Sequence, residues 1–105
     1  MEKVYSQYDM GGLLKTLDGM KMLANEFKDN DLLDILDKNF IVKEKSYSSS
    51  LGHKNYAMEK FNLDEIKNSI TNLIPKYKSM KENGNFETRL YSSVQLLKIN
   101  KILGN

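Results

Sequence analysis

The sequence predicts a small all-α domain, a bundle of about four helices that ends in an αα-hairpin. Apolar residues between 62 and 81 recur at steps of three and four, which places them on one face of a helix. A second apolar segment, from 85 to about 103, follows after a connection short enough for two antiparallel helices. The 105 residues are expected to form a single domain spanning 1–105.

The segment 62–81 has the clearest helix signals in the chain. Asn62, followed three residues later by Glu65, is a capping box that satisfies free backbone N–H groups of the first turn. Pro75 conflicts with a straight helix because it has no N–H and its ring clashes with the carbonyl of Thr71, at a cost of about 3 kcal/mol. We therefore expect a kink between Thr71 and Pro75, with a complete break as the alternative.

Two further helices are expected in the first forty residues. Asp9 can cap the first one, and either Asp29 or Asn30 can cap the second, shorter one. The outer face of the second helix carries three acidic residues at three-residue steps: Asp31, Asp34 and Asp37. A cation site needs oxygen ligands that converge from a loop, so we expect a charged surface here and no metal.

The segment 40–61 is the least regular part of the sequence. Its first residues, Phe40-Ile41-Val42, favour a strand, and a serine- and glycine-rich stretch follows them. One interpretation is a small β-hairpin with strands near 40–46 and 55–61. The other is an irregular insertion with a mobile loop at 43–55, followed by a short helix. We favour the loop, because the alternation expected of a half-buried strand is poor.

No pattern in the sequence indicates catalysis. The one histidine, His53, follows serines at 48–50, but no nucleophile-elbow motif and no orienting acid accompany them. Gly11-Gly12 lacks the lysine and serine of a phosphate-binding loop. The chain has no cysteine, which excludes thiol catalysis and thiolate metal sites. We expect a non-enzymatic protein without a metal or a cofactor.

The final helix is apolar on nearly all sides. Its main stripe, expected to face the helix at 62–81, consists of Phe86, Leu90, Val94 and Leu97. Further apolar residues lie largely on its other faces: Tyr91, Leu96, Ile99, Ile102 and Leu103. Such a helix is covered on more than one side, and a monomer of this size offers limited cover. We therefore predict that these five residues form a protein interface, most simply in a homodimer.

The uneven distribution of charge supports an alternative function. The net charge is +2, but residues 1–40 carry −3 and residues 41–105 carry +5. Four basic residues gather around the predicted hairpin, where they could contact phosphates: Lys76, Lys78, Lys81 and Arg89. Since Arg89 is the only arginine, base-specific bidentate contacts are limited. A small DNA- or RNA-binding regulator is thus the alternative prediction.

The function that the sequence favours is a small regulator, inhibitor or adaptor that binds another protein. Its apolar runs are too short to span a membrane, and its first residues contain no apolar signal segment, so we expect a cytoplasmic location. Lysine, asparagine and isoleucine are abundant and have AT-rich codons. This composition favours a low-GC bacterium, or one of its phages or plasmids, as the source.

Overall fold

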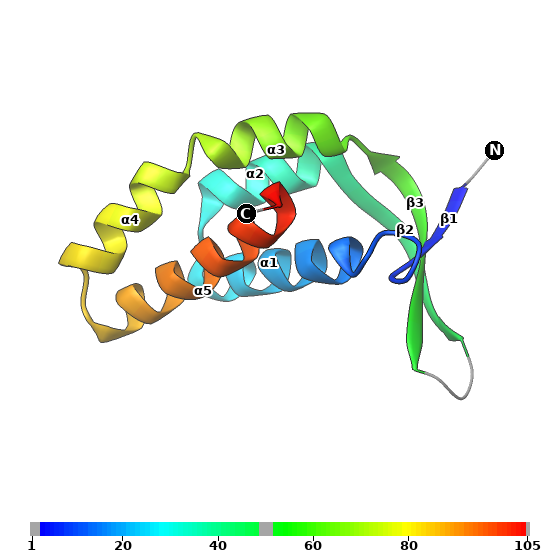
Figure 1. Cartoon of the computed structure of the whole chain (residues 1–105), viewed down its shortest axis with the longest axis horizontal. Helices are drawn as coiled ribbons and strands as arrows, with labels where there is room; N and C mark the ends of the chain where they lie inside the picture. Colours follow the sequence, from blue (N-terminus) through cyan, green and yellow to red (C-terminus); the bar gives the residue numbers. More distant parts are fainter. Residues whose placement is uncertain (1–2, 49–51, 105) are drawn as a thin grey trace.

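A computed structural model describes residues 3–48 and 52–104, which form three strands and five helices. In chain order the elements are β1 (Lys3–Ser6), α1 (Leu13–Phe27), α2 (Asn30–Asn39), β2 (Phe40–Ser48), β3 (His53–Phe61), α3 (Leu63–Thr71), α4 (Ile74–Asn83) and α5 (Phe86–Leu103). The fold is therefore α+β, and the all-α prediction is wrong. The helices gather on one side of the sheet, and the β2–β3 hairpin extends away from them (Figure 1).

The sheet is antiparallel, with the strand order β1-β3-β2. Residues 40–48 and 53–61 are thus the paired strands of a β-hairpin, as in the first interpretation, and the preference for a loop over these residues was wrong. The pairing of β2 with β3 shifts between Ile41 and Val42 and again between Val42 and Glu44. Each shift interrupts the inward and outward alternation of side chains, which explains the poor strand pattern. Residues 49–51 of the predicted mobile loop lie outside the described residues.

The first helix begins later than its apolar pattern indicates. Gly11 and Gly12 both have positive φ angles, 59° and 82°, which a right-handed helix excludes. The helix α1 therefore starts at Leu13. Asp9, the predicted cap, instead accepts a hydrogen bond from the backbone N–H of Ser6 at 3.2 Å, in the turn that follows β1.

The helix predicted at 62–81 is two helices. Asn62 caps α3 as predicted, because its side-chain oxygen accepts from the N–H of Glu65 at 3.2 Å. The chain then breaks between Thr71 and Ile74, and Pro75 lies in the first turn of α4. At that position a missing N–H leaves no helical hydrogen bond unmade, so the proline is accommodated by a break and not by the expected kink.

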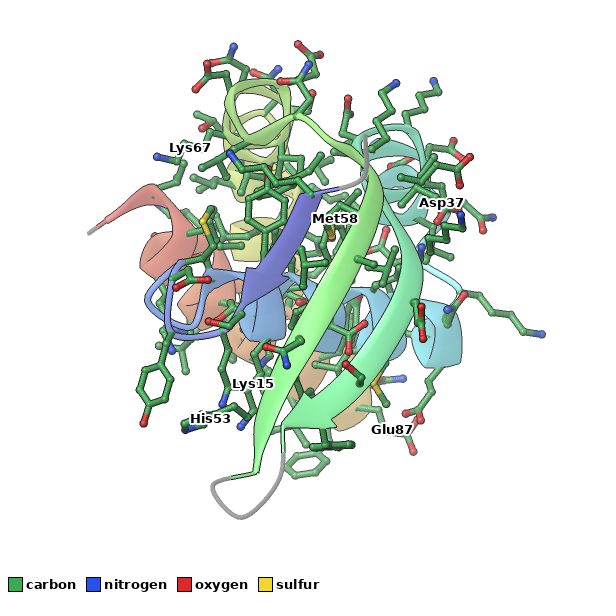
Figure 2. All side chains as sticks on the ribbon, turned by 90° about the vertical axis from the view of Figure 1, so that its right-hand side faces the viewer. Lys15, Asp37, His53, Met58, Lys67 and Glu87 are labelled. Atoms are coloured by element: carbon green, nitrogen blue, oxygen red, sulfur yellow. The ribbon has the colours of Figure 1, made fainter. Side chains whose placement is uncertain are left out.

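One hydrophobic core lies between the helices and the inner face of the sheet. Tyr56 and Met58, two residues apart on β3, are both buried against the helices, as the period of a strand requires. Figure 2 looks onto the sheet with the helices behind it and labels Met58. The main helical members of this core are Leu14, Leu17, Met20, Leu32, Leu36, Ile66, Ile70, Tyr77 and Ile99. The αα-hairpin expected at the C-terminal end is present as α4 and α5 (Figure 1).

Candidate functional site

The helix α5 has two apolar faces, and the structure buries the one that was predicted to bind another protein. Tyr91, Leu96, Ile99 and Ile102 are buried, and Leu103 is half-buried against the core. These side chains are covered by the chain itself, because α1, α3 and α4 all pack against α5. The surface that α5 offers to another molecule is therefore formed by other residues.

Those residues come from the stripe that was expected to face inward. Phe86, Leu90 and Leu97 are 77, 56 and 71% exposed, respectively. They follow one another on one side of α5 at steps of four and seven residues. Three large apolar side chains aligned in this way are more informative than a single exposed leucine, since they form a continuous apolar strip.

A groove of about 920 Å³ lies beside this strip, between α4 and α5. Its apolar lining consists of Ile74, Leu96 and Leu97, and its charged lining of Lys78, Lys81, Glu82 and Arg89. A smaller hollow of about 340 Å³ shares Lys81 and Arg89 with the groove and adds Phe86 and Leu90. We refer to the two together as the α4–α5 groove. Leu96 is thus the member of the predicted interface that also reaches this surface.

The four basic residues of the predicted hairpin separate into two groups. Lys76 forms ion pairs with Asp29 at 2.8 Å and with Asp31 at 3.2 Å. Burial alone would lower the pKa of Lys76, but its hydrogen bonds to the two carboxylates outweigh burial and raise it. The other three, Lys78, Lys81 and Arg89, line the groove and have no ion-pair partner among the described residues.

The buried carboxylate of Asp29 connects α2 to the two helices that form the groove. Of the two predicted caps of α2, Asp29 and Asn30, the cap is Asp29, which accepts from the N–H of Leu32 at 3.4 Å and has a side chain that is only 2% exposed. It also accepts hydrogen bonds from the hydroxyls of Tyr77 on α4 and Tyr91 on α5, the latter at 2.8 Å. Burial would raise the pKa of Asp29, but these bonds and the charge of Lys76 hold it below its usual value.

The two tyrosines extend this cluster toward α1. Burial, reinforced by the nearby carboxylate, raises the pKa of Tyr77 and of Tyr91, so both hydroxyls stay protonated and act as donors. Gln95 donates to the hydroxyl of Tyr91 at 3.1 Å and to the carbonyl of Met20 at 3.2 Å. The ring of Phe27 stacks on Tyr91 at 4.1 Å. The hydrogen bonds of this cluster thus connect α4 and α5 to α2 through Asp29, and to the backbone of α1 through Gln95.

Sequence analysis identified Asp29 as a cap but missed its tyrosine partners. They lie 48 and 62 residues further along the chain, beyond the range of any local pattern. A general signal was present, because tyrosines in an apolar helix face require a buried acceptor for their hydroxyls.

The other residues considered for catalysis or metal binding do not come together in one site. His53 lies edge-on to Tyr8, with ring centroids 4.0 Å apart, and Ser49 and Ser50 are outside the described residues. Asp31 pairs with Lys76, and Asp37 pairs with Lys21 at 3.0 Å. Within residues 3–48 and 52–104, no group of three or more His, Asp or Glu side chains is placed to hold a metal ion.

Comparison of the chain with models of known protein families, with curated proteins and with solved structures gives no match. In the part of the chain that the structure describes, no helix combines the length and the apolar character needed to cross a membrane. Evidence about function therefore comes from the α4–α5 groove itself.

Proposed function

We propose that this protein is a non-enzymatic regulator, inhibitor or adaptor that binds an acidic amphipathic helix of another protein in the α4–α5 groove. The observation that carries the proposal is the row of exposed apolar residues on α5 beside three cations that pair with no carboxylate in the described part of the chain. The apolar face of a partner helix would cover Phe86, Leu90 and Leu97, and its acidic residues would lie near the cations.

The dimensions of the surface suit such a partner. Phe86 and Leu97 are eleven residues apart on α5, which corresponds to about 16 Å along the helix axis. This distance accommodates about three turns of a second helix. Lys78, Lys81 and Arg89 outnumber the single acidic residue of the main groove, Glu82, so an acidic partner is attracted and a basic one is repelled. The absence of cysteine suits a reducing compartment, and we place the interaction in the cytoplasm.

Charge also separates this partner from the two competing occupants. A two-fold homodimer through the groove would bring the same cations of both copies together, which costs free energy. A nucleic acid would neutralise the cations but leave Phe86, Leu90 and Leu97 exposed to water. An acidic amphipathic helix satisfies both parts of the surface.

A labelled peptide tests the proposal directly. The probe is a synthetic helix with leucines on one face and glutamates on its flanks, and binding is measured by fluorescence anisotropy. We expect the wild type to bind it, Leu97→Ser to lose binding at least about tenfold because an apolar anchor is removed, and Arg89→Glu to weaken it. Val4→Ser is the matched control, because Val4 is comparably exposed but lies on β1.

Three outcomes would overturn the proposal. The first is no binding at low salt, and the second is equal binding of a basic version of the peptide. The third is a concentration-dependent dimer in sedimentation experiments that Leu97→Ser converts to a monomer, which would identify a second copy of the chain as the occupant. If the peptide test supports the proposal, proteins captured from the native host by the wild type but not by Leu97→Ser would identify the physiological partner.

A further inference from the structure

A second hollow, separate from the α4–α5 groove, is lined by four lysines. It measures about 330 Å³ and lies between the first half of α1, the last part of α5 and the start of β3. The lysines are Lys15, Lys54, Lys98 and Lys101, and we refer to the hollow as the lysine pocket. The one carboxylate in its lining, Asp18, is already paired with Lys45 at 2.6 Å.

These four ammonium groups are not neutralised within the described chain. None of the four has an ion-pair partner among residues 3–48 and 52–104. The ammonium of Lys54 instead lies over the ring of Tyr47, 5.8 Å from its centroid. Positive charges gathered without a counter-ion repel one another, so a bound anion would stabilise this arrangement.

Two glycines, Gly19 in α1 and Gly12 directly before it, leave space for the lysines of α5 close to the backbone. A Cβ atom at Gly19 would lie 3.2 Å from the Nζ atom of Lys98, and one at Gly12 would lie 4.0 Å from the Nζ atom of Lys101. Gly19 is in the interior of α1, where glycine costs roughly 0.5–1 kcal/mol relative to alanine. The position thus leaves room for the ammonium of Lys98 at the expense of helix stability.

Exposed aromatic rings lie at the same end of the molecule. Tyr47 is 68% exposed and is the direct cross-strand partner of Lys54. The exposed ring of Tyr8 contacts His53, the residue before Lys54. His53 is labelled in Figure 2, and it directly precedes Lys54 on β3. Lysines that contact phosphates, next to aromatic rings that stack on bases, are the combination that binds single-stranded nucleic acids.

We propose that the lysine pocket binds the phosphate backbone of a single-stranded nucleic acid, with the ring of Tyr47 as a stacking surface for a base. The contacts are independent of sequence, because lysine ammonium groups act as point charges and select no base edge. The site shares no residue with the α4–α5 groove, so the inference does not depend on the proposed protein partner.

The test uses labelled oligothymidine and oligouridine of about 12 nucleotides, within the usual footprint of a single-strand binding site. Anisotropy titrations from about 50 to 200 mM salt should give a steep loss of affinity, with a logarithmic slope of about −3 if all four lysines contact phosphates. Lys98→Glu combined with Lys101→Glu should lower the affinity at least about tenfold. Tyr47→Ala should lower it about tenfold, through the loss of stacking.

The matched control separates the pocket from the net charge of the protein. Lys38→Glu combined with Lys60→Glu makes the same change in net charge at two exposed lysines on α2 and β3. This control should keep affinity within about threefold of the wild type if the pocket is the site. Circular dichroism verifies folding, and the pair Lys98→Gln with Lys101→Gln replaces the charge reversal if that variant unfolds.

Several results would overturn the inference. They are no binding at about 50 mM salt, equal losses in both double variants, and equal affinity for a duplex of the same length. Loss of binding with Lys78→Glu and Lys81→Glu, but not with the pocket variants, would move nucleic-acid binding to the α4–α5 hairpin. Full competition by inorganic phosphate at the same phosphate concentration would identify a site for small anions only.

Discussion

The α4–α5 groove and the lysine pocket are both cationic, but they differ in what lies between the charges. In the groove, Lys78, Lys81 and Arg89 surround an apolar lining that includes Ile74 and Leu97. In the pocket, the lysines surround helix backbone at two glycines and the side chain of Thr16. Positive charge alone therefore does not specify a ligand. The apolar lining favours a protein helix, and the lysines gathered around the two glycines favour a small anionic group such as a phosphate.

The two surfaces also differ in how rigidly they are supported. The two helices that form the groove are tied together by Asp29, whose buried carboxylate bonds to residues of both α4 and α5. Among residues 3–48 and 52–104, no hydrogen bond or ion pair fixes the lysines of the pocket in this way, and their ammonium groups sit on flexible side chains. A rigid surface selects one shape, whereas a flexible cationic surface accepts many sequences of nucleic acid.

The largest expected effect comes from removing the support of the groove. Asp29→Ala should lower the free energy of unfolding by about 3–5 kcal/mol, because it leaves two buried tyrosine hydroxyls without an acceptor and removes a helix cap. Urea unfolding followed by circular dichroism measures this change. Asp31→Ala is the control, since Asp31 pairs with the same lysine but is exposed, and it should cost at most about 0.5 kcal/mol. A loss below about 1 kcal/mol for Asp29→Ala would contradict this role.

A smaller effect, dependent on pH, should follow from Asp29→Asn. The folded protein holds the pKa of Asp29 below its usual value, so the carboxylate stabilises the fold above the pKa of the unfolded chain, about 3.9. This contribution is lost as the pH falls through the folded-state pKa. Asp29→Asn should therefore cost about 1–3 kcal/mol at pH 7, and the difference from the wild type should shrink below about pH 4. If the difference in unfolding free energy between Asp29→Asn and the wild type stays constant from pH 7 to pH 3, this explanation is refuted.

Gly19→Ala should separate stability from anion binding in the lysine pocket. Alanine should raise the free energy of unfolding by about 0.5–1 kcal/mol, because it favours the helix and the crowded ammonium of Lys98 can move away. The same displacement should weaken oligonucleotide binding. Asn25→Ala, at an exposed position of α1, should also raise stability but leave binding unchanged. Equal binding by both variants would show that Lys98 does not need the space at Gly19.

The smallest expected effect on stability is that of Leu97→Ser. Because Leu97 is largely exposed in the folded chain, its replacement should change the free energy of unfolding by no more than about 0.5 kcal/mol. Ile99→Ala, two residues away on the buried face, should cost about 2–5 kcal/mol in the same urea titration. Similar losses of unfolding free energy in the two variants would mean that Leu97 is as buried as Ile99, and that α5 is rotated relative to its orientation in this structure.

The parts of the fold that the sequence predicted correctly are those determined by local contacts. The caps at Asp29 and Asn62 satisfy N–H groups within one turn, so a few neighbouring residues suffice to recognise them. The sheet was missed because shifts in pairing near Val42 disturb the alternation and because β1 pairs with a strand about fifty residues away. The orientation of α5 was missed because it is apolar all round, and only its neighbours decide which face is buried.

Separation along the chain also decided which parts of the candidate site could be predicted from the sequence. The basic residues Lys78, Lys81 and Arg89 were expected to lie together, and they do, since a short hairpin connects α4 to α5. The separate role of Lys76 depends on Asp29, which reaches it only through the packing of α2 against the rest of the molecule. Interactions of this kind follow from tertiary structure and leave no local pattern.

The order of strands in the sheet also sets an order of events during synthesis. Lys3 of β1 pairs with Met58 of β3, and at about 5–20 residues per second a ribosome makes the second some 3–10 s after the first. The helices α1 and α2 are complete by then, and β2 is the element that directly precedes β3 in the chain. The strand that is translated first therefore has no partner strand until β3 has been made, and a nascent chain carries it unpaired up to that point.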